Sequence, residues 1–287
     1  MKTGFIGTGL TGSAIDSLLI SAGNHLAAFN RTQIKTDKLV NQGPIWYDSP
    51  AEVAAVSDLV FTMVGFPSDV ASVYFGEKGI FKQLKPDAIV VDMTTSKPSL
   101  AVKISKYTTE HHFHALDAPV SGGDIGARNA SLTIMVGGEE KIYQKLLPIF
   151  KTIGKTTTYF GAAGAGQHAK MANQIMIAGT MTGLTEMLLY TQKAGLDEQK
   201  VLAALSSGGA DNWSMENYVP RILRNDYTPG FFARHFLKDL RIALDEADKM
   251  GLDLRATENA KRLYEIMVDV KGLGDQGTQG LINIYKK

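Results

Sequence analysis

Cysteine is absent from all 287 residues. Without thiols the chain forms no disulfide, no cysteine-ligated zinc site and no thiol nucleophile, so a reducing, cytoplasmic location is expected. Long apolar runs are missing too, since no window approaches the roughly 18 uninterrupted apolar residues that a membrane span requires. The first residues, MKTGFIGTG, enter a strand-like segment without the apolar core and cleavage site of a signal peptide.

An excess of charge of one sign is also lacking. The chain has 30 Lys+Arg and 29 Asp+Glu, a formal net charge of +1, which excludes a strongly basic nucleic-acid-binding protein. Hydrophobic residues make up 44% and charged residues 21%, close to the globular average, which excludes a disordered or fibrous chain. The length predicts about two domains.

Short apolar runs alternate with helical patterns in the first part of the chain, as in a parallel sheet covered by helices. Strands are expected at 3–7, 25–29, 58–64, 88–93, 113–118, 132–136 and 156–160, and helices at 10–22, 33–41, 50–56, 97–109 and 139–151. This alternation predicts an α/β doubly wound Rossmann domain over residues 1–160.

After residue 160 the pattern changes. The Gly/Ala-rich segment 161–167 opens a helix over about 165–192 that is apolar nearly all round, as expected of a helix between domains or subunits. Every later periodic segment has the 3.6-residue period of a helix: 197–207, 217–225, 233–251 and 257–272. The sequence therefore predicts an all-α second domain over residues 161–287.

A glycine motif follows the first strand and opens the first helix. It consists of Gly7, Thr8, Gly9, Leu10, Thr11 and Gly12. Glycines at this spacing allow a tight turn, the approach of a pyrophosphate to backbone amides, and close helix–strand packing. The helix N-terminus then offers N–H groups to the phosphates, so these six residues are predicted to bind a dinucleotide.

The end of the second strand indicates which dinucleotide. An acidic residue there would bind the adenosine ribose of NAD, but the chain has Asn30, Arg31 and Thr32 and no carboxylate before Asp37. A guanidinium suits a 2′-phosphate, so NADP(H) is favoured over NAD(H). The alternative is that Arg31 is a solvated surface charge. We also expect Val64 and Gly65 near the adenine and Thr95 nearer the nicotinamide.

Two further groups predict substrate chemistry. Ser121, Gly122 and Gly123 follow a strand and offer a hydroxyl and unencumbered amides to a small carboxylate, unless they form an ordinary glycine turn. Lys170 lies in an otherwise apolar helical segment with Asn173 and Gln174 on the same face. An ammonium there can donate a proton to a carbonyl that is being reduced, although an isolated helix lysine is more often structural.

Four segments carry a family resemblance: GFIGTGLTG, residues 117–138, GAGQHAKMANQ at 164–174, and PGFFARHFLKDLRIAL at 229–244. In them the chain resembles the β-hydroxyacid dehydrogenases, which include 3-hydroxyisobutyrate dehydrogenase, tartronate semialdehyde reductase and glyoxylate/succinic semialdehyde reductases. The resemblance implies a helical domain that builds homodimers or homotetramers. Thr8 and Thr11 stand where the family usually has Leu and Met, while the glycine motif itself is retained. Ala130 stands where many relatives have Gly, which leaves the substrate size open.

The resemblance also implies roles for individual residues. Lys170 would be the catalytic acid/base, and Ser121–Gly123 would hold the substrate carboxylate. The remaining roles are Asn173 or Gln174 for orienting the substrate, Thr95 and Lys238 at the nicotinamide half of the cofactor, and Phe231 and Asp239 in the substrate pocket.

The sequence thus predicts an NADPH-dependent oxidoreductase that interconverts a small aldehyde acid and its hydroxy acid. The identity of the acid, the physiological direction and the choice between dimer and tetramer stay open. Alternatives are an imine reductase on the same scaffold, against which Lys170 argues, and a non-catalytic NADP-binding interaction module. No metal, nucleic-acid or membrane partner is expected; His111, His112 and His114 do not form a convincing metal motif.

Overall fold

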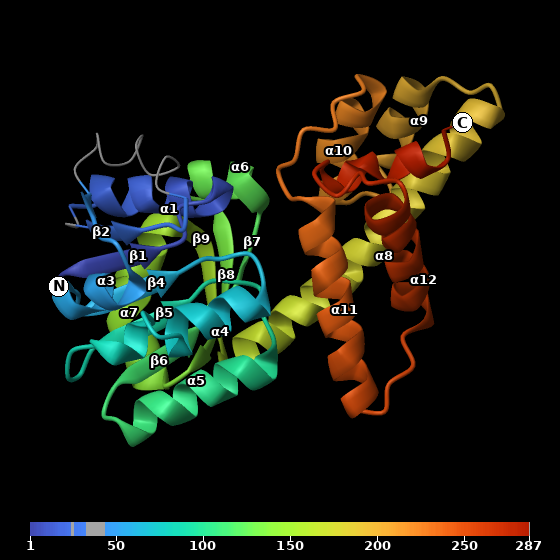
Figure 1. The fold of residues 1–287 in the computed structure, drawn as a ribbon. Helices are drawn as coiled ribbons and strands as arrows, with labels where there is room; N and C mark the ends of the chain where they lie inside the picture. Colours follow the sequence, from blue (N-terminus) through green and yellow to red (C-terminus); the bar gives the residue numbers. More distant parts are fainter. Residues whose placement is uncertain (24–25, 33–43, 287) are drawn as a thin grey trace. The chain divides into compact units, whose positions relative to one another are not determined.

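The computed structural model describes residues 1–23, 26–32 and 44–286, and the chain divides into two compact units, Met1–Lys170 and Met171–Lys287 (Figure 1). The expected helix at 33–41, Asp37 and the first residue of the expected strand at 25–29 lie outside the described residues. We describe each unit by itself.

Within the described residues of the first unit, nine strands form one sheet in the order β3-β2-β1-β4-β5-β6-β8-β7, with β9 paired to β8. The strands are β1 Thr3–Ile6, β2 Leu26–Phe29, β3 Ile45–Trp46, β4 Leu59–Thr62, β5 Ile89–Asp92, β6 His114–Asp117, β7 Val120–Ser121, β8 Leu132–Gly138 and β9 Gly154–Gly161. All neighbours from β3 to β6 are parallel, in the order of a dinucleotide-binding fold. The predicted Rossmann architecture is confirmed.

The far side of the sheet differs from a purely parallel arrangement. Strand β8 runs antiparallel to both β6 and β7. The expected strands did not include β3 or β7, and Ser121 was expected in a loop, because a strand of two residues is too short to show an alternating pattern. Ser121 therefore ends a strand at this mixed edge of the sheet.

Helices cover both faces of the sheet (Figure 1). Successive strand residues point to opposite faces, so Phe5 packs with the core under α1 and α7, whereas Ile6 packs with the core under α3, α4 and α5. The helices are α1 Leu10–Ser21, α3 Pro50–Val56, α4 Pro67–Phe75, α5 Pro98–Glu110, α6 Gly123–Arg128 and α7 Glu140–Ile153, with a 3-10 turn at Ile80–Lys82. Proline at the first position of α3, α4 and α5 has its ring preset for a helix start.

The named elements of the second unit are all helical within its described residues, as predicted, and one isolated bridge joins Phe232 and Gly277. Helix α8 begins in the first unit and continues into the second. The elements are α8 Ala165–Lys193, α9 Glu198–Leu205, α10 Trp213–Leu223, α11 Ala233–Lys249 and α12 Arg255–Glu265, a π turn at Ile266–Val270 and a 3-10 helix at Thr278–Ile284. One of its cores includes Phe236, Leu240 and Tyr264. Among the described residues, no helix is long and apolar enough to cross a membrane.

Candidate active site

The carboxyl ends of β2, β1, β4 and β5 meet at one edge of the sheet, because these strands are parallel neighbours. Backbone hydrogen bonds join their loops: Gly7 N donates to Phe29 O and Met63 N donates to Ile6 O, both at 2.9 Å. The Thr94 hydroxyl accepts from Val64 N at 3.0 Å. The predicted cofactor-binding segments of this unit therefore lie side by side at the strand-order reversal, where such sheets bind ligands.

The three glycines of the motif have different surroundings. A Cβ on Gly7, whose φ is +104°, would lie 2.1 Å from Met63 O, and one on Gly12 would lie 2.1 Å from Gly7 O. A Cβ on Gly9 would enter open space. Gly7 and Gly12 are thus required by the turn, whereas the space over Gly9 is available to a ligand.

The same loop has polar groups suited to a phosphate. Gly9 is the N-cap residue of α1 and, as a glycine, provides no side-chain oxygen for the first N–H groups of the helix. The Thr8 hydroxyl is buried and has no hydrogen-bond partner in the part of the chain that the structure describes. These groups fit a pyrophosphate at a helix N-terminus. Thr11 is half-buried in the first turn of α1; the side chain of Leu10 lies outside the described set.

Arg31 is exposed and ion-paired. Its side chain is 85% exposed, and Nη1 lies 3.2 Å from Oδ1 of Asp69. The other oxygen of Asp69 accepts from Phe66 N at 3.1 Å in a capping position of α4. Asn30 donates to Thr32 O at 2.9 Å and shapes the same loop. Asp69 was not among the predicted site residues, because it lies 38 residues from Arg31 and shows only the pattern of a helix cap.

Gln167 links the loop that carries Thr95 to helix α8. Its Nε2 donates to Thr94 O at 2.7 Å, and its Oε1 accepts from Ser96 N at 2.9 Å. Thr94 and Ser96 are buried, and Thr95 between them is half-buried. A single amide side chain therefore fixes the backbone on both sides of Thr95.

Asp117 fixes the start of the same helix. Its two carboxylate oxygens accept from Gly164 N and from Gln167 N, each at 2.8 Å. A carboxylate at a helix N-terminus satisfies unpaired N–H groups and interacts favourably with the helix dipole. A Cβ on Gly166 would lie 2.4 Å from Met135 O, so only glycine lets the helix start so close to the sheet. Lys170, 6% exposed, follows Gln167 by one helical turn.

Asp92 lies beside Asp117 on the neighbouring strand β5. Its Oδ1 accepts from the Thr62 hydroxyl at 2.9 Å and from Thr94 N at 3.1 Å. Burial raises the pKa of Asp92 to about 6, and the charge of Asp117 adds to this effect against the opposing hydrogen bonds. Burial also raises the pKa of Asp117, although backbone N–H groups oppose the shift. The roles of Asp92, Asp117 and Gln167 were not predicted from the sequence, although Asp117 and Gln167 lie in the family-like segments.

Ser121, Gly122 and Gly123 connect β7 to α6 and are half-buried. Gly122 has a φ of +122° and Gly123 a φ of +62°, a backbone conformation that strongly favours glycine. Successive N–H groups in such a turn form a concave site for an anion. The local geometry therefore suits the predicted carboxylate binding.

In the second unit, four predicted residues form a polar chain. Gln174 Nε2 donates to Asp239 Oδ2 at 2.6 Å, and Asn173 Nδ2 donates to Gln174 Oε1 at 2.8 Å. Lys238 Nζ lies 2.9 Å from Asp239 Oδ1. Asp239 is fully buried and Gln174 is 2% exposed, whereas Asn173 is half-buried. The structure thus connects both amides to Asp239, and Asn173 is the more accessible of the two.

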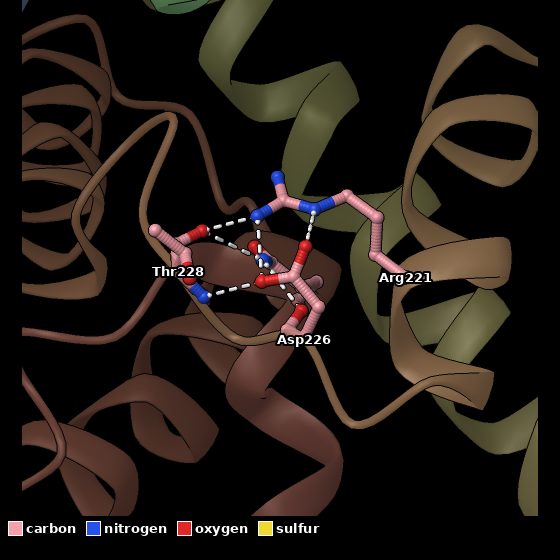
Figure 2. A network of polar contacts seen from close by, with 4 residues as sticks. Arg221, Asp226 and Thr228 are labelled. Carbon is pink, nitrogen blue, oxygen red and sulfur yellow. Dashed lines mark hydrogen bonds and ion pairs between the residues drawn. The ribbon is translucent and has the colours of Figure 1, made fainter.

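A second network holds the loop that carries Phe231. Figure 2 shows Arg221 paired with Asp226, whose carboxylate also accepts from Thr228 N at 3.0 Å. Gln279 donates to the carbonyl oxygens of Asp226 and Thr228. Arg221 holds the pKa of Asp226 well below its ordinary value. This network fastens the segment between α10 and α11, in which Phe231 is half-buried.

The histidines near residue 112 have ordinary polar contacts. His111 Nδ1 lies 2.8 Å from Tyr107 O. His114 Nδ1 lies 2.9 Å from Glu139, a carboxylate that the sequence analysis did not associate with it. No group of three or more metal-ligating side chains comes together in the described ranges.

Two family profiles cover most of the chain. The NAD-binding domain of 6-phosphogluconate dehydrogenase matches residues 2–161, and the NAD-binding domain of NADP-dependent 3-hydroxyisobutyrate dehydrogenase matches residues 164–285. A probable 3-hydroxyisobutyrate dehydrogenase-like protein of Arabidopsis thaliana, named as mitochondrial, is 47% identical over 98% of this chain and 84% of its own length. The 2-hydroxy-3-oxopropionate reductase of Escherichia coli is 36% identical, covering 92% of this chain and 90% of its own.

A solved structure is similar along the whole chain. The 3-hydroxyisobutyrate dehydrogenase of Mycobacterium tuberculosis, described with L-serine, has a TM-score of 0.89 and 25% identity, covering 100% of this chain and 99% of its own. The chain therefore shares its fold with this protein.

Proposed function

The chain belongs to the β-hydroxyacid dehydrogenase family, whose members are NAD(P)-dependent oxidoreductases acting on CH–OH groups, and on this premise we propose that it reduces a small aldehyde acid with NADPH, Lys170 acting as the acid. In the reverse direction the same residue is the base. The substrate class is a short carboxylate with an aldehyde or hydroxyl group, such as glyoxylate or a semialdehyde.

The observation that carries this proposal is the support given to Lys170. Asp117 caps α8, and Gln167 ties its first turn to the loop around Thr95. An acid must be held in place to deliver a proton, and a positioned donor contributes about 100- to 10,000-fold to a rate. A buried lysine directly after such a network is better explained by catalysis than by a snorkelling surface chain.

Each remaining residue has a role that its surroundings support. Ser121 and the amides after it bind the substrate carboxylate, which leaves the carbonyl as the reacting group. Lys170 Nζ donates a proton to the carbonyl oxygen as it becomes a hydroxyl. When bound, NADP(H) supplies or accepts the hydride. Holding the substrate in one orientation removes much of the entropic cost of reaction.

The cofactor preference rests on Arg31. Its exposed guanidinium stands at the end of β2, where the fold places the adenosine ribose, and it matches a 2′-phosphate. The open space over Gly9 and the hydroxyl of Thr8 suit the pyrophosphate. The neighbouring loops complete the proposed cofactor contacts with Asn30, Thr32, Val64, Gly65 and Thr95.

The polar chain of the second unit supports substrate binding. We assign substrate contact to Asn173, because Gln174 is buried and donates to Asp239. Lys238 is assigned to the cofactor and Phe231 to the substrate.

A homo-oligomer is part of the proposal, because Met176 and Tyr190 of α8 are 67% and 74% exposed in the single chain. A cytoplasmic location is also part of the proposal.

The test is the variant Lys170→Ala with Lys193→Ala, an exposed lysine of the same helix, as the matched control. We expect kcat for the best aldehyde acid to fall about 100- to 10,000-fold, while the Kd of NADPH changes less than about twofold. The panel includes glyoxylate, succinic, tartronate and methylmalonate semialdehydes and one cyclic imine. A kcat within a few-fold of wild type would refute the role of Lys170, and turnover of the imine alone would refute the reaction.

A further inference from the structure

A carboxylate contacts the guanidinium that is assigned to the cofactor phosphate. Asp69 approaches Arg31 from the start of α4, while Arg31 stands after β2. Strands β2 and β4 both flank β1, so the loops that follow them lie on either side of the glycine motif. The pair therefore stands where the fold places the adenosine end of a dinucleotide.

The pair contributes little to stability. The Arg31 side chain is 85% exposed, and ion pairs between exposed groups add little because solvent screens them and side chains lose freedom. Asp69 itself is held by a different contact, since its Oδ2 accepts from Phe66 N. The carboxylate is thus fixed by the helix start, and its Oδ1 is presented to Arg31.

We propose that Asp69 is a specificity-determining residue that competes with the 2′-phosphate for Arg31 and so limits the preference for NADPH over NADH. This inference rests on the proposed role of Arg31. A carboxylate beside the guanidinium cancels its charge and repels an arriving phosphate dianion. A ribose that carries only hydroxyl groups is not repelled, so Asp69 penalises the phosphorylated cofactor selectively.

Two adenosine fragments isolate this end of the cofactor. Adenosine 2′,5′-bisphosphate carries the 2′-phosphate and 5′-AMP does not, so the ratio of their Kd values, measured by calorimetry, reports discrimination without turnover. Asp69→Asn removes the charge and keeps an oxygen that can accept from Phe66 N. We expect it to raise the preference for the bisphosphate about three- to tenfold and to leave 5′-AMP nearly unchanged.

Three further variants make the result decisive. Asp69→Glu retains a carboxylate at a capping position and should keep the wild-type ratio. Glu77→Gln, an exposed residue just after α4, changes net charge equally and should also keep it. Arg31→Ala should lower the preference for the bisphosphate roughly tenfold or more.

The outcomes separate two claims, the NADP(H) preference assigned to Arg31 and the competition by Asp69. If Arg31→Ala leaves the ratio unchanged, the proposed NADP(H) preference has failed at its assigned residue. If Arg31→Ala lowers the ratio but Asp69→Asn leaves it unchanged or also lowers it, only the competition is overturned. Thermal unfolding of each variant confirms that the compared proteins are folded. If Asp69→Asn is unstable, Asp69→Ser removes the same charge, keeps a side-chain oxygen near Phe66 N, and should raise the ratio in the same way.

Discussion

Two segments, the start of α8 in the first unit and the loop before α11 in the second, are held by carboxylates in opposite electrostatic situations. In the first unit, Asp117 and Asp92 are buried, accept from neutral N–H and hydroxyl groups, and have raised pKa values. In the second, Asp226 is 38% exposed at its side chain, pairs with Arg221 and has a lowered pKa. A buried carboxylate with neutral donors fixes backbone geometry firmly but is costly to ionise, whereas an exposed ion pair costs little and contributes little.

The largest effect should come from Asp117→Ala. The variant leaves two buried N–H groups unpaired, those of Gly164 just before α8 and of Gln167 in its first turn, so we expect a loss of about 2–5 kcal/mol in the free energy of unfolding. Urea unfolding measures this loss. Because Gln167 N is one of the two donors, kcat should fall as well.

The matched control for that variant is Asp58→Ala. Asp58 is also an acceptor for a backbone N–H, that of Lys2, but its side chain is 47% exposed. Its loss should cost less than about 1 kcal/mol. Equal losses in the free energy of unfolding for Asp117→Ala and Asp58→Ala would show that burial of Asp117 does not increase its contribution to stability.

Asp92→Asn should change how stability depends on pH. A carboxyl whose pKa is raised from 3.8 to about 6 by folding stabilises the protein fully below about pH 4, and this contribution is lost as pH rises through 6. Asparagine keeps the oxygen that accepts from Thr62 and Thr94 but does not titrate. At pH 8 we therefore expect the variant to be more stable than wild type, by at most about 3 kcal/mol.

The measurement is the free energy of unfolding in urea at intervals from pH 4 to 8, for wild type, Asp92→Asn and Asp58→Asn. The pKa of Asp58 is lowered by the Lys2 N–H and by Lys85, so its variant should keep the wild-type slope between pH 4 and 6. An unchanged slope in Asp92→Asn would mean that Asp92 ionises normally in the folded protein.

The sequence predicted the parts of this molecule that depend on local pattern. The glycine motif follows directly from adjacent residues, and the long apolar α8 and amphipathic α11 follow from periodicity. The supports of the candidate site could not be found this way, because Gln167 and Ser96 are 71 residues apart and Asp69 and Arg31 are 38 apart. Only the strand order brings those residues together, and a glutamine or aspartate in a helix start has no pattern that names its distant partner.

The smallest effect is expected for Asp226→Asn. Folding lowers the pKa of Asp226 because Arg221 hydrogen-bonds to it, so its contribution to stability is present above about pH 4 and is lost as pH falls. Solvent screening keeps that contribution under about 1 kcal/mol at pH 7. The difference in stability between wild type and Asp226→Asn should therefore shrink as pH falls. The difference in stability between wild type and Asp92→Asn should instead grow as pH rises above 4.

Asp269→Asn supplies the control, because Asp269 is also exposed and paired with an arginine, Arg241. Both variants should show a similar, small decrease in the free energy of unfolding, measured in urea at pH 7. Only Asp226→Asn should raise KM for the aldehyde acid, by a few-fold, since Asp226 fastens the loop that carries Phe231 and Asp269 does not. An equal KM in the two variants would show that the Asp226 network serves stability alone. The exposed carboxylate Asp226 would then differ from the buried carboxylates in purpose as well as in electrostatics, because Asp92, Asp117 and Asp239 would serve the reaction and Asp226 would not.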